Sequence, residues 1–579
     1  MWLTLASKSV SSVVSQPYSG TSVPVNSVTN RLTMRLINID TYKLESFDEV
    51  NLPKYGILSH TWEGEEVQFS EMINVSMANL QSEPKFRKVR ECSKLAQIDR
   101  FKYIWVDTCC IDKSSSAELQ EAINSMFRWY ENAEVCYIFL SDHAPGKLSD
   151  SRSLGKCRWV TRGWTLQELI APSVVKFYAQ DWSLLGDKAN DAGYIANATG
   201  INLAVLESRD LSNASVAQRM SWAAKRNCTR LEDVAYSLMG LFGINMPMLY
   251  GEGHNAFRRL QEEIVKSSND LTIFAWNPAE VVKYCSIFAP YPAVFSESAD
   301  VKKFNPAFSH PEFTLNNKGL RMQTSLWKYQ CEQTGTKTLR YFLRLGGDPS
   351  KPTGVFLIMV GPGYFFRDGH MLFSTVSKSM VAAGMRTTEI YIATHPPMTT
   401  KSIDLTSFSQ ISFVVPSNQK YMKPTIAIPE ELWDDSNSLF FGTVNHIIQV
   451  LQIQLRIPNT SVEISVVVLY DRLANPGASL IFNREDWRRY GRLTKYLFRP
   501  RNANERFRMR DLLWEYPEIE NLTDHFGVIV SKERYTIKAI MQLEMLGNIS
   551  TTCVYSLAFE VSKEQSESLV KGLSLPTRK

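Results

Sequence analysis

Three short strings hold the side chains best suited to chemistry, and each lies at or just after a run of apolar residues. They are Leu58-Ser-His-Thr-Trp62, Trp105-Val-Asp-Thr-Cys-Cys-Ile-Asp-Lys113 and Arg162-Gly-Trp-Thr-Leu-Gln-Glu-Leu-Ile-Ala-Pro172. A carboxylate in such a place can stabilise a positive charge that develops during a reaction. Cys109 and Cys110 would be nucleophiles only beside an activating base, and we favour the interpretation that they are buried, inert thiols.

Alternating strand and helix patterns position these strings. Four apolar runs are typical of buried strands: Lys54–His60, Lys102–Asp107, Glu134–Leu140 and Val174–Ala179. An apolar stripe from Leu119 to Tyr130 predicts a helix that packs on the sheet, and Ser115-x-x-Glu118 marks its start as a capping box. We therefore expect a parallel sheet with helices on both faces, in which ligands bind beyond the carboxyl ends of the strands. Ser59, Asp107 and Glu168 should then share one edge.

The rest of the chain divides by pattern. A helical pattern runs from about Leu203 to Trp276, where Thr229-x-x-Glu232 predicts a helix start and Gly243 a helix end. After about Pro278, short alternating runs predict an all-β, sandwich-like region. The expected organisation is a disordered leader (1–33), an α/β domain (34–200), a helical region (201–278) and a β-rich region (279–579).

The three strings, taken in order, closely resemble the motifs of the fungal heterokaryon incompatibility (HET) family. The stretch from Met220 through Leu249-Tyr-Gly-Glu-Gly253 to Trp276 looks like the helical region that commonly follows a HET domain. The resemblance covers Met34–Trp276, a little under half of the chain. It implies signalling between self and non-self that ends in cell death, activated by self-association or by an incompatibility partner protein.

HET domains are similar to TIR domains, which implies a flavodoxin-type fold and an activity on NAD. Ile57-Leu-Ser-His60 looks like the strand motif Phe-Leu-Ser-Phe of plant-type TIR domains. Trp164-Thr-Leu-Gln-Glu-Leu169 is similar to their Trp-Cys-Leu-Asp-Glu-Leu motif, whose glutamate is catalytic. The chain departs from these motifs at His60, Thr165 and Gln167.

By this resemblance Glu168 is the catalytic residue and NAD is the substrate. Nicotinamide leaves NAD as a neutral molecule, so a lone carboxylate suffices, unlike the carboxylate pair of ordinary glycosidases. The expected substrate-binding residues are Ser59, His60, Trp62, Asp107, Arg162 and Trp164. Either tryptophan could stack on a flat ring, and the serine, histidine and aspartate could bond ribose or phosphate. No metal and no bound cofactor are expected.

Structural interpretations compete with this one. Thr165-x-x-Glu168 is itself a capping box, so Glu168 could serve only to start a helix. Arg226 and Arg230 could bind an anion, although pairing with Glu232 or Asp233 is the commoner outcome. The rival function is a non-enzymatic adaptor that acts through protein–protein association.

Charge, cysteine pattern and hydropathy argue against several other classes of protein. The net charge of +5 arises from a basic run between Asn483 and Arg510, with ten Lys/Arg against three acids. This run leaves open an effector that binds RNA or lipid, but we favour a solvated connection, so nucleic acid is disfavoured as a partner. The nine cysteines form no C-x-x-C pair, which indicates reduced thiols in a cytoplasmic protein. No apolar run is long enough to predict a membrane span.

Overall fold

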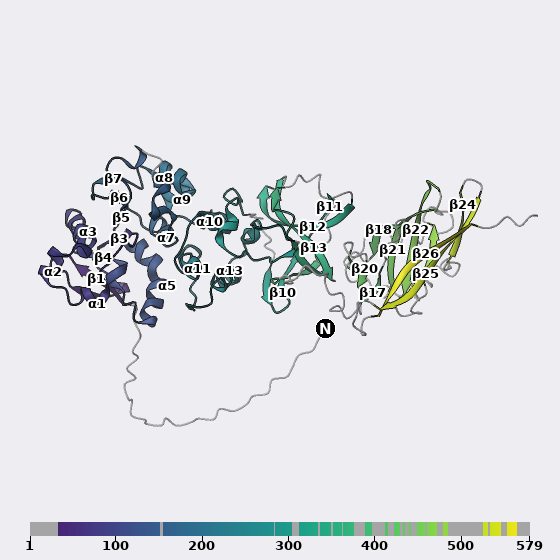
Figure 1. Ribbon diagram of the computed structural model, residues 1–579, viewed down its shortest axis with the longest axis horizontal. Coiled ribbons are helices and arrows are strands. Elements are labelled where there is room, and N and C mark those ends of the chain that lie inside the picture. The colour runs from purple at the N-terminus through teal and green to yellow at the C-terminus, as the bar shows by residue number, and fades with distance from the viewer. Residues whose placement is uncertain are drawn as a thin grey trace, which may run out of the picture.

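The computed structural model describes residues 33–150, 154–282, 284–303 and, in shorter stretches, strands between 312 and 563. All but the last residue of the expected leader, and the basic run after Asn483, lie outside the described residues. Figure 1 shows the described parts in chain order along the long axis, from an α/β part through helices to two β parts.

The N-terminal part is built on a seven-stranded mixed sheet with the order β2-β1-β4-β3-β5-β6-β7. The strands are β1 (Thr33–Asn38), β2 (Leu44–Asp48), β3 (Tyr55–His60), β4 (Tyr103–Trp105), β5 (Val135–Phe139), β6 (Val175–Tyr178) and β7 (Leu184–Asp187). The four central strands, β4, β3, β5 and β6, are parallel. If these four strands are numbered by their order along the chain, their order across the sheet is 2-1-3-4. This is the strand order of flavodoxin-like sheets. The edge strands β1, β2 and β7 are antiparallel, so the sheet is mixed and not purely parallel as expected.

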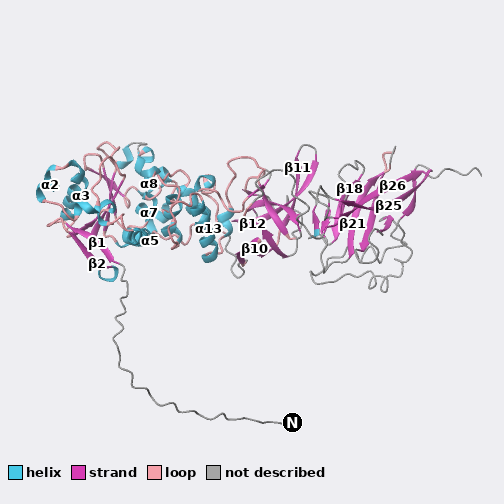
Figure 2. Ribbon diagram, turned by 60° about the horizontal axis from the view of Figure 1, so that its bottom comes forward, coloured by secondary structure: helices cyan, strands magenta, loops and turns pink. Residues whose placement is uncertain are grey.

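Helices cover both faces of this sheet. The connection from β3 to β4 carries α1 (Phe69–Met72), α2 (Met77–Ser82) and α3 (Arg87–Ile98), and that from β4 to β5 carries α4 (Asp107–Cys110) and α5 (Ser116–Asn132). The connection from β5 to β6 carries α6 (Arg158–Thr161) and α7 (Thr165–Ile170). Because the first connection runs in the opposite direction to the other two, right-handed crossovers put α3 and α5 on opposite faces. Helix α7 packs beside α5, and Figure 2 shows the helices around the strands.

Helix α5 begins where the sequence predicts. Ser115 is its N-cap and accepts a hydrogen bond from the backbone N–H of Glu118 at 3.3 Å. The other half of the expected capping box is absent, because the Glu118 carboxylate instead pairs with Arg35 and accepts from the backbone N–H of Asp112 at 2.8 Å. The apolar stripe of α5 packs on the sheet through Ala122, Ile123, Met126, Trp129 and Tyr130.

The helical part consists of short helices: α8 (Ala192–Thr199), α9 (Leu203–Ser208), α10 (Val216–Ala223), α11 (Asp233–Tyr236), α12 (Met239–Phe242) and α13 (Asn255–Ser267). The predicted capping box at Thr229 is wrong. Glu232 instead accepts hydrogen bonds from the backbone N–H groups of Gly251 and Gly253, at 2.8 and 3.0 Å. The predicted stop is confirmed, because Gly243 ends α12 in the left-handed conformation with a φ of 64°.

The β-rich region contains two units. A nine-stranded sheet holds β8 (Tyr284–Cys285), β9 (Phe313–Asn316), β10 (Gly319–Thr324), β11 (Trp327–Gln333), β12 (Thr336–Asp348), β13 (Lys351–Gly361), β14 (Tyr364–Asp368), β15 (Ser374–Thr375) and β16 (Thr388–Ile392). Many of its buried apolar side chains belong to one continuous core that extends from Met34 through the helical part to Ile392, and two smaller clusters, around Ile358 and Phe342, lie apart from that core.

The second β unit has a core of its own, to which two sheets contribute. The six-stranded sheet contains β17 (Ile411–Val414), β19 (Trp433–Asp434), β20 (Leu439–Phe441), β24 (His525–Val530), β25 (Glu533–Met545) and β26 (Cys553–Lys563). The four-stranded sheet contains β18 (Met422–Ile428), β21 (Ile448–Arg456), β22 (Glu463–Asp471) and β23 (Ser479–Asn483). In the described part of the chain, no helix has the length and apolar character needed to cross a membrane.

Candidate functional site

A cavity of about 480 Å³ lies at the carboxyl ends of β3 and β4, between the α/β part and the helical part. The α/β part contributes the polar residues His60, Trp62, Asp107, Lys113, Arg162, Trp164 and Glu168. The helical part contributes Thr229, Arg230, Asp233 and Tyr250, and the apolar floor comes from Ile111 and the residues Leu119, Ile123, Met126 and Tyr130 of α5. Of the seven residues predicted from the sequence, six line this cavity. The seventh, Ser59, lies directly behind Glu168.

Glu168 is held at the wall of the cavity by a buried chain of hydrogen bonds. Its side chain is buried, and its Oε2 accepts a hydrogen bond of 2.5 Å from the hydroxyl of Ser59 at the end of β3. The indole N–H of Trp159 in turn donates to that hydroxyl at 2.7 Å. Burial raises the pKa of Glu168 to about 7, against the opposing effects of the Ser59 hydrogen bond and the Arg162 charge. The carboxyl group can therefore gain or lose a proton near neutral pH.

The alternative that Glu168 serves only as a helix cap is contradicted by the geometry. Trp164 stands at the N-cap of α7, without a side-chain cap. The Thr165 hydroxyl donates to the main-chain oxygens of Trp159 and Arg162, at 2.6 and 2.9 Å. It also accepts a hydrogen bond of 2.9 Å from the guanidinium of Arg226. Thr165 and Glu168 thus each have another partner, and no capping box forms.

Trp62 and its neighbours form the wall next to β4. The Trp62 indole N–H donates to Asp107 Oδ2 at 2.9 Å. The Lys113 ammonium lies 3.8 Å from the centroid of the Trp62 ring, and the Arg162 guanidinium carbon lies 5.6 Å from it. The expected stacking platform is therefore already in contact with two cations, although 41% of Trp62 is exposed.

His60 lies between two carboxylates behind this wall. Its Nδ1 is 3.9 Å from Asp107 Oδ1, and its Nε2 is 3.6 Å from Glu66 Oε2. Both distances exceed those of a hydrogen bond. His60 and Lys88 hold the pKa of Glu66 below its ordinary value, even though burial acts in the opposite direction. Both ring nitrogens of His60 are buried, lie near these two carboxylates and have no hydrogen-bond partner.

The sequence did not predict the wall that comes from the helical part. The Arg230 guanidinium carbon lies 4.5 Å from the centroid of the Tyr250 ring, and the Tyr250 hydroxyl donates to Asp233 Oδ1 at 3.0 Å. Burial raises the pKa of Asp233, while hydrogen bonds from Tyr250 and Trp164 oppose this rise. The expected pairing of Arg226 and Arg230 with Glu232 or Asp233 is wrong, because in the described structure these arginines contact Thr165 and Tyr250 instead.

Main-chain hydrogen bonds attach the helical part to the loop in front of Glu168. Asn227 N–H donates to Thr161 O at 2.6 Å, and Gly163 N–H donates to Asn227 O at 2.9 Å, which forms a short parallel bridge. A Cβ atom on Gly163 would lie 2.3 Å from Cys228 Sγ. The absence of a side chain at Gly163 therefore allows the close approach that closes the cavity.

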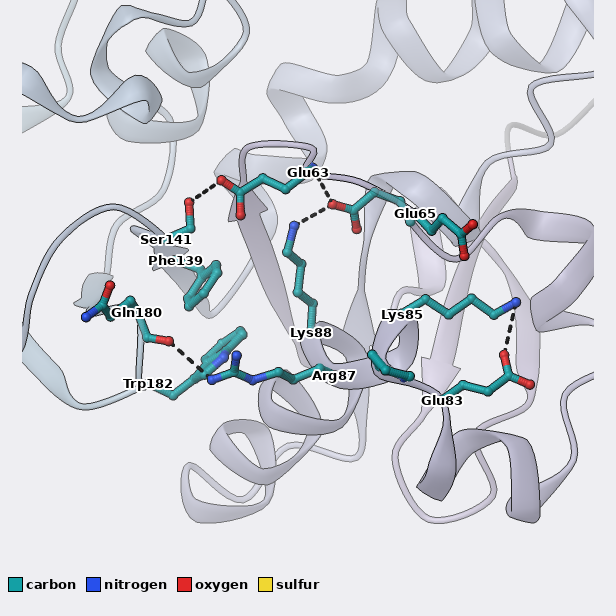
Figure 3. Close-up of a pocket in the computed structure, with 12 residues that line it drawn as sticks. Glu63, Glu65, Glu83, Lys85, Arg87, Lys88, Phe139, Ser141, Gln180 and Trp182 are labelled. Carbon is teal, nitrogen blue, oxygen red and sulfur yellow. Dashed lines mark hydrogen bonds and ion pairs between the residues drawn. The ribbon is translucent and has the colours of Figure 1, made fainter.

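A second hollow, of about 750 Å³, lies at the same edge near α3 (Figure 3). Its charges are largely paired with one another. Lys85 lies 3.0 Å from Glu83, Lys88 pairs with Glu66, and the Arg87 guanidinium donates to Gln180 O at 3.2 Å. Because these cations already have partners, this hollow is less suited than the first cavity to bind a charged ligand.

Metal and thiol chemistry find no support in the described residues. No group of three or more His, Cys, Asp or Glu side chains in that part of the chain could hold a metal ion. Cys109 is buried, and its contact with Cys110 together with burial raises its pKa well above the ordinary value. A thiol in this state is a poor nucleophile.

Two family models match parts of the chain. Residues 55–156 match the heterokaryon incompatibility protein (HET) family, and residues 255–330 match a domain of unknown function (DUF8212). Over 229 residues the chain is 46% identical to the vegetative incompatibility protein HET-E-1 of Podospora anserina. The aligned region is 38% of this chain and 17% of that protein. No solved structure shows a significant match.

The chain therefore contains a HET domain, and it spans only a small part of the length of its relative. The HET match includes Ser59, His60, Trp62 and Asp107 but ends before Arg162 and Glu168. The cavity is thus assembled from residues inside the HET match and residues beyond it.

Proposed function

We propose that this protein acts in heterokaryon incompatibility as an effector of regulated cell death, and that its cavity cleaves NAD. The HET match and the similarity to a vegetative incompatibility protein support the first part. The second part rests on the TIR-like interpretation of the α/β part and on the geometry around Glu168. Activation by self-association or by a partner protein belongs to the same proposal.

One observation carries the catalytic assignment. Glu168 combines a wall position in the cavity, a hydrogen bond from Ser59 and a pKa of about 7. Strongly shifted carboxyl groups in clefts are candidates for catalysis, because keeping them buried has a cost in stability. A residue that served only to start helix α7 would not need to be buried against Ser59.

The reaction follows from the chemistry of a buried carboxylate. The bond between C1′ of the ribose and the nicotinamide nitrogen breaks, and its electron pair leaves with nicotinamide as a neutral molecule. The Glu168 carboxylate stabilises the oxocarbenium cation that remains. Water then adds to C1′, and its proton passes to Glu168 and on to solvent. With a pKa near 7, Glu168 is suited to accept that proton.

Purified full-length protein incubated with NAD provides the direct test. Wild type should release nicotinamide, measured by liquid chromatography, and Glu168→Gln should release none while remaining folded by circular dichroism. Glu131→Gln, which changes an exposed glutamate near the end of α5, is the matched control and should behave as wild type.

The adaptor alternative makes the opposite prediction. Expression of wild type and of Glu168→Gln should then kill cells equally, and cellular NAD should stay constant in both. Death without NAD loss, together with the absence of nicotinamide release from a protein that is active in cells, would overturn the catalytic proposal.

A further inference from the structure

Three cations line the cavity without a carboxylate oxygen within 4 Å, although each lies near enough to a carboxylate to act on it electrostatically. In the described part of the chain, Lys113, Arg162 and Arg230 take part in no ion pair, although most cations around the second hollow do. The Lys113 nitrogen is buried and has no hydrogen-bond partner. Lys113 and Arg162 contact Trp62 on one side of the cavity, and Arg230 contacts Tyr250 on the other. Positive charge therefore faces the cavity from both the α/β and the helical part.

We propose that Arg230, held on Tyr250, acts with Lys113 and Arg162 to bind the phosphate groups of a dinucleotide whose ribose lies against Glu168. This inference rests on the proposed function, because it assigns the remainder of the same substrate. It adds the helical part to the substrate site, so that the HET match alone does not contain a complete site.

The chemistry of the three side chains fits phosphate. A guanidinium presents a planar set of N–H groups that can bind two phosphate oxygens at once, whereas an ammonium binds as a point charge. Arg230 contacts the Tyr250 ring and is exposed, so its N–H groups are accessible to a ligand. Burial lowers the pKa of Lys113, so a bound anion would favour its charged form.

The arrangement of opposite charges fits a dinucleotide better than a lone anion. Glu168 and Asp107 lie in the same cavity as the cations, and carboxylates repel a phosphate but bind ribose hydroxyls. The Tyr250 ring is fixed by its hydrogen bond to Asp233, which keeps Arg230 at the helical wall. Carboxylates and cations thus alternate along both walls, and a ligand that carries ribose hydroxyls as well as phosphates offers a partner to each kind of group.

Equilibrium binding to full-length protein tests this assignment, with ADP-ribose, ADP, inorganic phosphate and nicotinamide riboside as probes. Arg230→Gln should lower the affinity for ADP-ribose and for ADP by about tenfold to a hundredfold, as expected for the loss of charge-assisted hydrogen bonds. Binding of nicotinamide riboside, which has no phosphate, should stay within about twofold. Lys225→Gln, at an exposed cation of the same segment that does not line the cavity, is the control and should leave every affinity unchanged.

The outcomes separate this inference from the proposed function. Binding of ADP-ribose that depends on Arg230, in a protein that kills cells without lowering cellular NAD and releases no nicotinamide, would support the phosphate site and overturn the catalytic proposal. A wild type that cleaves NAD, together with an Arg230→Gln variant that loses the same affinity for every probe, would overturn the phosphate site alone. The same conclusion would follow if Arg230→Gln lost no affinity for any probe. Inorganic phosphate bound as tightly as ADP would overturn the dinucleotide assignment, and a wild type that binds none of the probes would overturn both.

Discussion

The carboxyl group of Glu168 is buried against Ser59, and burial raises its pKa to about 7. If the carboxylate is the active form, kcat/KM for NAD should rise about tenfold per pH unit below pH 7 and level off above it. A pH profile of nicotinamide release measures this directly. A profile that is flat from pH 5 to pH 8, or that falls through this range, would contradict the role of the anion.

Ser59→Ala provides a sharper form of the same prediction. The Ser59 hydroxyl donates to Glu168 and lowers its pKa, so its loss should raise that pKa further. The rising limb of the profile should therefore move to higher pH, with partial recovery of the rate at pH 8.5 to 9. A variant with a lower rate but an unshifted limb would show that Ser59 does not tune the pKa of Glu168.

The same burial should make Glu168 costly for stability. The folded-state pKa lies above the unfolded value, so the folded state binds the proton more tightly and stability falls as pH rises between about 4.5 and 7. Above pH 7 the cost is on the order of 3 kcal/mol, at about 1.4 kcal/mol per pKa unit. Glu168→Gln should therefore melt at a higher temperature than wild type at pH 8, and the difference should shrink at pH 5. Equal destabilisation at both pH values would contradict this.

At the scale of elements, apolar periodicity predicts the central sheet closely. The runs predicted as buried strands correspond to β3, β4, β5 and β6, with bounds that differ by at most two residues. These strands are buried on both faces, so their sequences are continuous apolar runs. The flanking strands β2 and β7 are only partly buried, and their sequences carry no comparable signal.

Only part of the cavity lining could be predicted, because only the residues at strand ends follow a pattern in the sequence. Residues at strand ends share an edge because the sheet places them there, so Ser59, Asp107 and Glu168 could be grouped from the sequence. Arg230 and Tyr250 reach the cavity because the helical part docks on the loop before α7. That docking depends on single contacts, such as the one between Asn227 and Gly163, which have no periodic pattern.

Gly163 offers a test of this docking. A Cβ atom there would lie 2.3 Å from Cys228 Sγ, so Gly163→Ala should separate the loop before Glu168 from the helical part. We expect a loss of about 1–3 kcal/mol in stability from overpacking, and a larger proportional loss of activity. Chemical denaturation and nicotinamide release measure the two effects.

Two further variants control for this change. In Gly193→Ala nothing lies within 4 Å of the new Cβ, and a helical alanine should slightly stabilise α8. Adding Cys228→Ala to Gly163→Ala removes the clashing sulfur and should restore part of both losses. An unchanged double variant would show that the sulfur is not the obstacle.

For the whole molecule, the continuous core determines where the chain can be divided. The sequence places a boundary at about residue 278, but the helices and the first β unit share one core. Trp276 donates to Ile287 O at 2.9 Å, and Gln261 donates to Ala289 O at 2.8 Å. The buried Arg367 guanidinium lies 3.9 Å from the Trp276 ring and donates to Phe274 O at 3.1 Å. A chain that ends after Trp276 would expose this apolar surface.

The final prediction therefore concerns truncation. A chain that ends after residue 395 keeps the continuous core and omits only the second β unit, so it should be soluble, whereas a chain that ends after Trp276 should aggregate. Figure 1 shows the second β unit at the opposite end of the molecule from the α/β part, and none of the residues described in that unit lines the cavity. Direct blocking of the cavity by this unit is thus not part of the described structure.

Nicotinamide release per molecule should be the same, within about twofold, for the chain ending after residue 395 and for the full chain. A switch from mostly inactive to mostly active requires roughly 5 kcal/mol, so a rise of tenfold or more on truncation would show that the second β unit restrains the site through self-association or another indirect route.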